Sequence, residues 1–174
     1  MVDLSRDEDY IAAAEADVRL VQLLLSKIDE FPEAVCYHCE QAVEKMLKQM
    51  FVDQGFMPRK NHDLNDLLGV ACEREWVRAT KEEVCAASFL SFYATKFKYI
   101  RMKESEKGEA YEAVISLQRV ADMLDRSGYA SVTVETPARF LRDEPPSLTQ
   151  TASRATAAAS GAHARRVGAS SDSL

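Results

Sequence analysis

The sequence predicts an all-α protein, an up-and-down four-helix bundle with an additional short helix. Apolar residues recur every three or four positions in four long segments, and residues that favour helix ends border these segments. No two segments alternate in the way that a pair of strands would. The chain has 174 residues, 47% of them apolar, which suits one domain with a substantial core. We assign the bundle to residues 1–130 and an extended or disordered tail to residues 131–174.

The first helix is expected to begin at a capping box formed by Ser5 and Glu8. At this spacing the serine hydroxyl accepts from the backbone N–H of the glutamate, whose side chain reaches back to the first residue. One apolar stripe follows and ends near residues 27–29. The stripe consists of Ile11, Ala14, Val18, Val21, Leu25 and Ile28.

The second helix, residues 32–55, is the element around which the others are expected to pack. Pro32 suits the first helical position and Gly55 the position just past the end. The connection at residues 29–31 is short, which predicts that the first two helices are antiparallel neighbours. The core stripe of the second helix is Val35, Cys39, Ala42, Met46 and Met50. A second stripe carries polar groups that can meet a ligand: His38, Gln41, Lys45 and Lys48.

Three further helices complete the predicted bundle. A short helix contains Leu64, Leu67, Leu68 and Ala71, with Asn61 or Asp63 as its cap. Thr80 and Glu83 form a second capping box, and the helix that starts there is expected to reach about Met102. Its aromatic-rich stripe is Ala86, Phe89, Tyr93, Phe97 and Ile100. Gly108 is expected to interrupt the chain before the last helix, which Gly128 closes. The stripe of the last helix is Ala110, Val114, Leu117, Ala121 and Leu124.

The C-terminal part of the chain has a different composition. Residues 132–134 are too short and isolated to predict more than an extended segment. After Leu148 hardly any large apolar residue follows, and Ala, Ser, Thr and Arg dominate. Such a segment cannot bury enough surface to offset its ordering entropy, so we expect residues 143–174 to be disordered.

Charge and hydropathy limit the classes of function. Residues 1–136 contain 25 acidic and 17 basic side chains, a net charge of −8, and residues 137–174 contain 3 acidic and 5 basic ones, a net charge of +2. An acidic body disfavours non-specific binding of nucleic acids, which depends on neutralising phosphates. No run is apolar enough to span a membrane, and the acidic N-terminus differs from a signal peptide, so a cytoplasmic location without membrane contact is expected.

Metal and cofactor sites are not expected. Cys36 and Cys39 form a CxxC in mid-helix, where buried free thiols are the commoner interpretation, and Cys72 and Cys85 make no second close pair. No Glu or Asp stands three residues before His38 or His62, which excludes the Glu-x-x-His pattern of di-metal bundles. We therefore predict no metal and no cofactor.

Two basic groups and one histidine are the candidates for binding a polyanion or a nucleotide. His62 precedes a helix start, where an anion can bind, although it can equally tie the loop to the bundle. The basic residues can also be a solvated face or a complement to a helix dipole. The first group is Lys45, Lys48, Arg59 and Lys60; the second is Lys96, Lys98, Arg101, Lys103 and Lys107. In a strictly antiparallel bundle these groups can lie at opposite ends, and a dimer can rejoin them.

Three segments resemble the HEPN domain family of prokaryotes. They are AVCYHCEQAVEKMLKQMF at residues 34–51, PRKNHDLNDLL at residues 58–68 and FYATKF at residues 92–97. The resemblance extends over about residues 5–130. It implies a four- or five-helix bundle that usually forms a homodimer, is often encoded beside a small nucleotidyltransferase, and either binds nucleotides or cleaves RNA. The positions that match the family pattern are His38, Gln41, Glu44, Lys45, Lys48, His62, Asp63 and Tyr93.

Two departures from the family pattern bear on function. Lys96 and Phe97 stand where many relatives have Arg and Tyr, and lysine does not replace the bidentate guanidinium at a phosphate site. Ribonuclease members carry an Arg followed after four to six residues by a His, whereas Arg59 lies three residues before His62 and Arg101 has no His before His163.

We therefore expect a non-catalytic HEPN protein that binds a nucleotide or a partner nucleotidyltransferase, as one half of a toxin–antitoxin or defence-type pair. Two alternatives remain open, a divergent metal-independent ribonuclease and a purely structural dimerisation module. Catalytic residues are not assigned. The candidate residues for binding a nucleotide or another polyanion are His38, Lys45, Lys48, His62, Asp63, Tyr93, Lys96 and Arg101, and RNA is a possible ligand.

Overall fold

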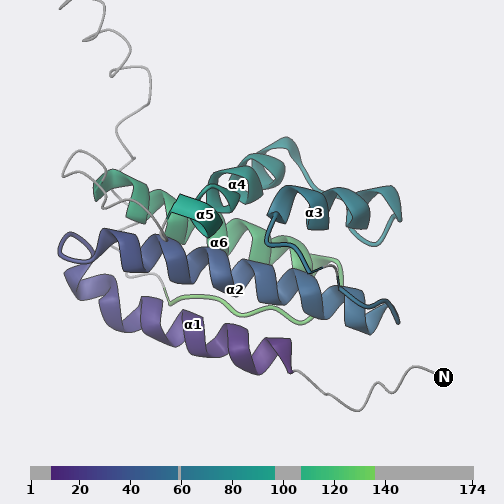
Figure 1. Cartoon of the computed structure of the whole chain (residues 1–174), viewed down its shortest axis with the longest axis horizontal. Coiled ribbons are helices and arrows are strands. Elements are labelled where there is room, and N and C mark those ends of the chain that lie inside the picture. The colour runs from purple at the N-terminus through teal and green to yellow at the C-terminus, as the bar shows by residue number, and fades with distance from the viewer. Residues whose placement is uncertain (1–8, 59, 97–106, 136–174) are drawn as a thin grey trace, which may run out of the picture.

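The computed structural model describes residues 9–58, 60–96 and 107–135, and in these ranges the protein contains helices and no strand. Figure 1 shows α1 and α2 side by side and antiparallel, with α6 behind them and α3 to α5 on the other side of α2. The predicted all-α bundle is thereby confirmed. The helices are α1 (Tyr10–Leu24), α2 (Pro32–Asp53), α3 (Leu64–Glu73), α4 (Lys81–Ser91), α5 (Tyr93–Lys96) and α6 (Lys107–Arg126), and a 3-10 turn, Leu25–Lys27, extends α1.

Helix α1 begins at Tyr10, later than the capping box at Ser5 and Glu8 predicts. Those two residues lie outside the described ranges. Asp9 is the observed cap, since it has non-helical backbone angles and its carboxylate accepts from the Ala12 N–H at 2.9 Å. The predicted stripe is confirmed, because all its members are buried except Ile11, which is partly buried against the core.

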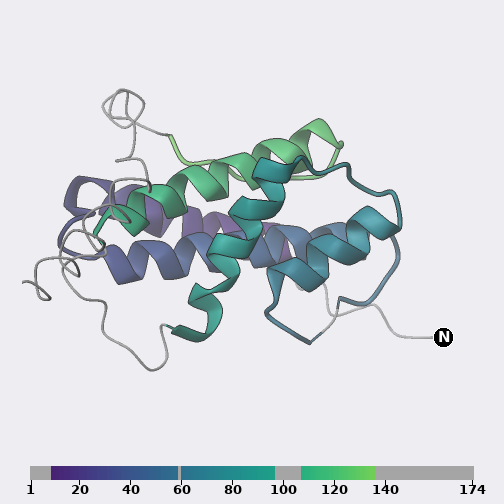
Figure 2. The ribbon, with the colours of Figure 1, turned by 90° about the horizontal axis from the view of Figure 1, so that it is seen from above.

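Helix α2 occupies the centre of the bundle. It packs against α1 on one side and against α6 on another (Figures 1 and 2). All five members of its predicted core stripe are fully buried. Pro32 is its first residue, and Gly55 follows its end with a φ of +76°, a left-handed conformation that glycine adopts without strain.

The helix expected to run from Thr80 to about Met102 is interrupted, so this prediction is wrong in its continuity. The capping box of Thr80 and Glu83 is present, but α4 ends at Ser91 and the four-residue α5 begins at Tyr93. Figure 2 shows α4 crossing α2 obliquely before the chain turns into α5. Phe92 at the break is exposed, whereas Tyr93 enters the core and donates to Glu109 of α6. Residues 97–106 lie outside the described ranges.

The last helix and the segment after it differ from expectation in two ways. Gly108 lies within the first turn of α6 and does not interrupt the chain there, whereas Gly128 closes α6 as predicted, with a φ of +83°. The extended segment after Gly128 is not isolated, because Val134 is buried and the Val132 N–H donates to Met46 Sδ at 3.2 Å. The predicted tail beyond Glu135 lies outside the described residues.

Candidate functional site

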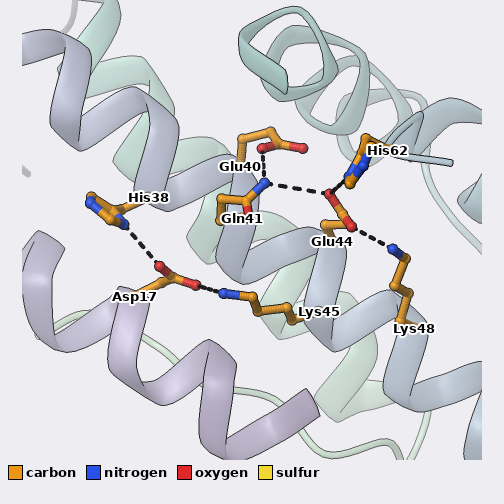
Figure 3. A network of polar contacts seen from close by, with 8 residues as sticks. All are labelled: Asp17, His38, Glu40, Gln41, Glu44, Lys45, Lys48 and His62. Atoms are coloured by element: carbon orange, nitrogen blue, oxygen red, sulfur yellow. Dashed lines mark hydrogen bonds and ion pairs between the residues drawn. The ribbon is translucent and has the colours of Figure 1, made fainter. Parts of the chain in front are cut away.

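Asp17 of α1 connects two predicted site residues of α2. Its carboxylate pairs with His38 Nδ1 at 2.8 Å through Oδ1 and accepts from Lys45 Nζ through Oδ2 (Figure 3). The Asp17 side chain is only 9% exposed, so the charge sits where water screens it poorly. The pairing fixes the rotation of α1 against α2 at the solvent edge of their contact.

Glu44 of α2 is the centre of a second cluster. Oε1 accepts from Lys48 Nζ at 2.6 Å, and Oε2 lies 2.9 Å from His62 Nδ1 and 3.5 Å from the Gln41 amide nitrogen. His62 comes from the loop before α3, so this buried carboxylate ties the loop to α2 (Figure 3). The His62 side chain remains 61% exposed.

Glu40 extends the second cluster into the core. It is fully buried, and its Oε2 accepts from the Gln41 amide at 2.9 Å, while Oε1 has no hydrogen-bond partner among the residues that the structure describes. Burial raises the pKa of Glu40 to about 7. The hydrogen bond from Gln41 lowers this pKa, and the charge of Glu44 raises it by a smaller amount. Near neutral pH this carboxyl is therefore half protonated, and it does not act as a permanent negative charge.

The predicted polar stripe of α2 is present, but its cations are already neutralised. Lys45 is bound to Asp17 and Lys48 to Glu44, and both histidines contact the same two carboxylates. Each ammonium keeps further donors that can meet a ligand. A phosphate that binds here must nevertheless approach two buried carboxylates, whose repulsion opposes the attraction of the lysines.

Asp63 and Tyr93 lie apart from these clusters. Asp63 caps α3 by accepting from the Asn65 N–H at 2.9 Å, and it also accepts from the Ser91 hydroxyl at 3.0 Å. Burial raises the pKa of Asp63, but these hydrogen bonds outweigh burial and hold the pKa below its usual value. Burial and then the hydrogen bond to Glu109 raise the pKa of Tyr93, which therefore stays a neutral phenol. Both residues thus have structural roles at helix contacts.

Most of the second basic group lies outside the described ranges. Lys96 ends α5, and Arg101 lies in residues 97–106, outside the described ranges. Of the predicted site residues, the structure brings together His38 with Lys45 and Lys48 with His62.

Asp17 and Glu40 are the residues of the site that sequence reasoning missed. Asp17 follows Ala14 by three residues and precedes Val18 by one, so it flanks the apolar stripe of α1. Glu40 and Glu44 are four residues apart on α2 and flank its stripe in the same way. An acidic residue at the edge of a buried stripe, with basic residues on the neighbouring helix, was the available signal.

Several kinds of chemistry find no support among the described residues. In these ranges no three His, Cys, Asp or Glu side chains are grouped so that they could hold a metal ion. Cys36 and Cys39 are buried and form no disulfide in the described ranges, and burial, followed by the charge of Cys36, raises the pKa of Cys39 well above its usual value. A thiol of raised pKa is a poor nucleophile. Within the same ranges, no helix is both long and apolar enough to cross a membrane.

Comparison with known proteins yields one match. The model of the family described as HEPN domain matches residues 8–127, which include all described helices up to the end of α6. No curated protein and no solved structure matches the chain at a significant level.

Proposed function

The chain belongs to the HEPN domain family, and from this premise we propose that it is a non-catalytic member that acts by binding a partner protein. The expected partner is a nucleotidyltransferase, with which the chain forms one half of a toxin–antitoxin or defence-type pair. The resemblance of residues 34–51 and 58–68 to the family pattern supports this class of partner. We place the pair in the cytoplasm.

The observation that carries the proposal is the neutralisation of the α2 stripe. Lys45 and Lys48 each contact a buried carboxylate, Asp17 and Glu44, so the stripe has little excess positive charge. Nucleic-acid binding draws its affinity from uncompensated cations that neutralise phosphates. A stripe of this kind is better suited to hold the bundle rigid than to attract RNA.

The absence of a nuclease pair from the sequence supports the non-catalytic assignment. Cleavage of RNA without a metal needs a base for the 2′-hydroxyl and a cation for the phosphate. No Arg in the chain is followed by a His after four to six residues. His62 contacts Glu44 through Nδ1, and this carboxylate is already shared with Lys48.

Nucleotide binding is the second candidate, and one observation favours it. The exposed ring of His62 shares the buried carboxylate of Glu44 with Lys48, whose side chain is 12% exposed, so an imidazole and an ammonium contact the same carboxylate. A small anion that contacts the imidazole and the ammonium needs only one local basic patch. A protein with a net negative charge can still have such a patch.

Three measurements on the purified chain separate these functions. Co-expression with a nucleotidyltransferase encoded beside it, followed by size exclusion, is expected to give a stable complex. Calorimetry with ATP, GTP and their diphosphates is expected to show no heat of binding, and incubation with RNA is expected to show no cleavage.

Saturable binding of a nucleotide that His62→Ala abolishes would establish the second candidate. Cleavage of RNA that the same change abolishes would overturn the non-catalytic assignment.

A further inference from the structure

The segment that follows α6 ends on α1. The Val132 N–H donates to Met46 Sδ of α2 at 3.2 Å, and the amide of Gln22 in α1 donates to the Glu135 carbonyl oxygen at 3.1 Å. In Figure 1 this segment, drawn in light green, runs along α1 and α2 toward the end of α1. Glu135 is the last described residue, so the chain leaves the described part of the structure beside the second half of α1.

Two leucines of α1 are exposed close to this point. Leu23 is 73% and Leu20 43% exposed. They are three residues apart, so they share one face of the helix. Leu23 directly follows Gln22, which holds the end of the described chain. An apolar patch therefore lies next to the position from which the chain continues.

We propose that residues 136–142, which we name the C-terminal strap, fold back over α1 of the same molecule and cover this patch. The strap has the sequence TPARFLR. Phe140 and Leu141 are its large apolar residues, and they pack on Leu23 and Leu20. The docked strap removes four apolar side chains from water, and this burial stabilises the fold. The inference holds whether or not the partner proposed above is found.

The chain between Glu135 and Phe140 is long enough for this docking. Five extended residues span at most about 17 Å. Leu23 is one residue on from Gln22, so it lies about 100° around a helix of about 11 Å diameter, a surface path of about 10 Å. Pro137 has a fixed φ and biases the residue before it toward extended backbone, which lowers the entropy lost when the strap docks.

The charges of the strap complement those at the end of α1. The strap carries Arg139 and Arg142 and no acidic residue, a net charge of +2. Residues 27–33, which lead from α1 into α2, contain one basic and three acidic side chains, a net charge of −2. Asp29 and Glu30 in this turn are exposed, so a guanidinium can reach them. Salt screens such exposed pairs, and the apolar contact is therefore the main source of stability.

A second exposed apolar group lies out of reach of the strap and supplies the control. Met57 is 69% exposed, which matches Leu23. It follows the end of α2, a helix of 22 residues and hence about 33 Å long, whereas α1 ends beside the start of α2. The neighbouring Phe56 is covered on one face by the Arg74 guanidinium, 4.3 Å from the ring centroid.

A double-mutant cycle in the full chain tests the docking. Leu23→Gln and Phe140→Gln are each expected to lower the folding equilibrium constant by about fivefold, as for half-burial of an apolar side chain. Glutamine has nearly the helix propensity of leucine, so Leu23→Gln leaves α1 otherwise unchanged. The double variant is expected to lose little more than either single variant, because both changes remove the same contact. Urea denaturation measures the four equilibrium constants.

Met57→Gln is the matched control for this cycle. Its effect is expected to be small and to add to that of Phe140→Gln, since the two residues share no contact. The proposal would be overturned if Phe140→Gln had no effect, or if its effect added fully to that of Leu23→Gln.

The methyl resonances of Leu23 give a test that does not depend on stability. In the full chain with labelled leucine methyl groups, Phe140→Gln is expected to shift the Leu23 signals, because an aromatic ring packed on a methyl group displaces its resonance. Leu148→Gln, beyond the strap, is expected to leave them in place. Leu23 signals that are the same in the wild type and in Phe140→Gln would overturn the proposal. If such signals changed with protein concentration instead, a second copy of the chain would be the occupant of the patch.

Discussion

Lys45 of α2 donates a hydrogen bond to the buried carboxylate of Asp17 of α1, which lies 28 residues earlier in the chain. The same carboxylate contacts His38 at 2.8 Å, so it holds two residues of one helical face. A lysine that appears in the sequence as a candidate ligand for phosphate is, in the folded chain, the partner of a neighbouring helix. This pairing turns a possible binding face into a contact that stabilises the bundle.

Asp17→Asn is expected to destabilise the protein by roughly 2–3 kcal/mol. Removal of one member of a fully buried ion pair costs about 3–5 kcal/mol, and the cost is lower here because Lys45 is 27% exposed and can be hydrated. Urea denaturation measures the change. Glu15→Gln on the same helix removes only an exposed ion pair and should cost less than about 0.5 kcal/mol. Equal effects of both substitutions would show that the Asp17 contacts contribute little.

Glu40→Gln is expected to change how stability depends on pH. The pKa of Glu40 rises from about 4.5 in the unfolded chain to about 7 in the folded protein, because burial disfavours the carboxylate. Between these values the native state binds more protons than the unfolded state, so stability falls as pH rises from about 4.5 to 7 and stays lower above it. The total loss is about 3 kcal/mol.

The glutamine variant lacks this titration. Its stability relative to the wild type should therefore be greater at pH 8 than at pH 5, and urea denaturation at the two pH values measures the difference. Glu82→Gln, on the exposed side of α4, is the matched control and should keep the wild-type dependence. If Glu40→Gln also kept that dependence, the carboxyl would not be the titrating group.

Thr80→Ala is expected to cost about 1 kcal/mol of stability. The Thr80 hydroxyl accepts from the Glu83 N–H at 3.3 Å, and Glu83 Oε2 accepts from the Thr80 N–H at 2.7 Å. Burial raises the pKa of Glu83, but the Thr80 N–H and Arg126 outweigh it and hold the pKa below its usual value. Thr80→Ser retains the hydroxyl and should stay within a few tenths of a kcal/mol of the wild type. An alanine variant as stable as the serine variant would refute the cap.

Substitution of two glycines in and after α6 should have opposite effects. Gly128→Ala places a Cβ on a residue at φ +83°, which costs about 1 kcal/mol although no atom lies within 4 Å of the added carbon. Gly108→Ala, in the first turn and equally free of contacts, should stabilise α6 by up to about 1 kcal/mol. Thermal unfolding of both variants measures the signs. A stabilising Gly128→Ala would contradict the left-handed end of α6.

Truncation after Arg142 tests whether the tail is disordered, as its composition predicts. Residues 143–174 contain hardly any large apolar side chain and are predicted to be disordered, so their removal should leave the melting temperature nearly unchanged. Calorimetric melting of the full and shortened chains measures this. A drop of several degrees would mean that the tail packs on the bundle.

The regular parts of the fold were predictable because they depend on local patterns. The stripe of α2 and the capping box of Thr80 and Glu83 follow from helical spacing and from hydrogen bonds within three residues. The break at Phe92 was not predictable, since no Pro or Gly marks it. The residues on either side of the break form hydrogen bonds with residues distant in sequence. Ser91 donates to Asp63, and Tyr93 donates to Glu109.

The sequence by itself determined the helical bundle, its core stripes and the resemblance to the HEPN family, because periodicity and motif order are properties of a linear chain. Only the tertiary structure decided that the lysines of α2 meet buried carboxylates. Lys45 and Lys48 have the same identity and spacing whether they face solvent or a carboxylate. Their partners come from Asp17 on another helix and from Glu44, which is buried only when the bundle forms. Burial removes the water that would otherwise screen these charges, and it thereby turns exposed cations into structural ion pairs.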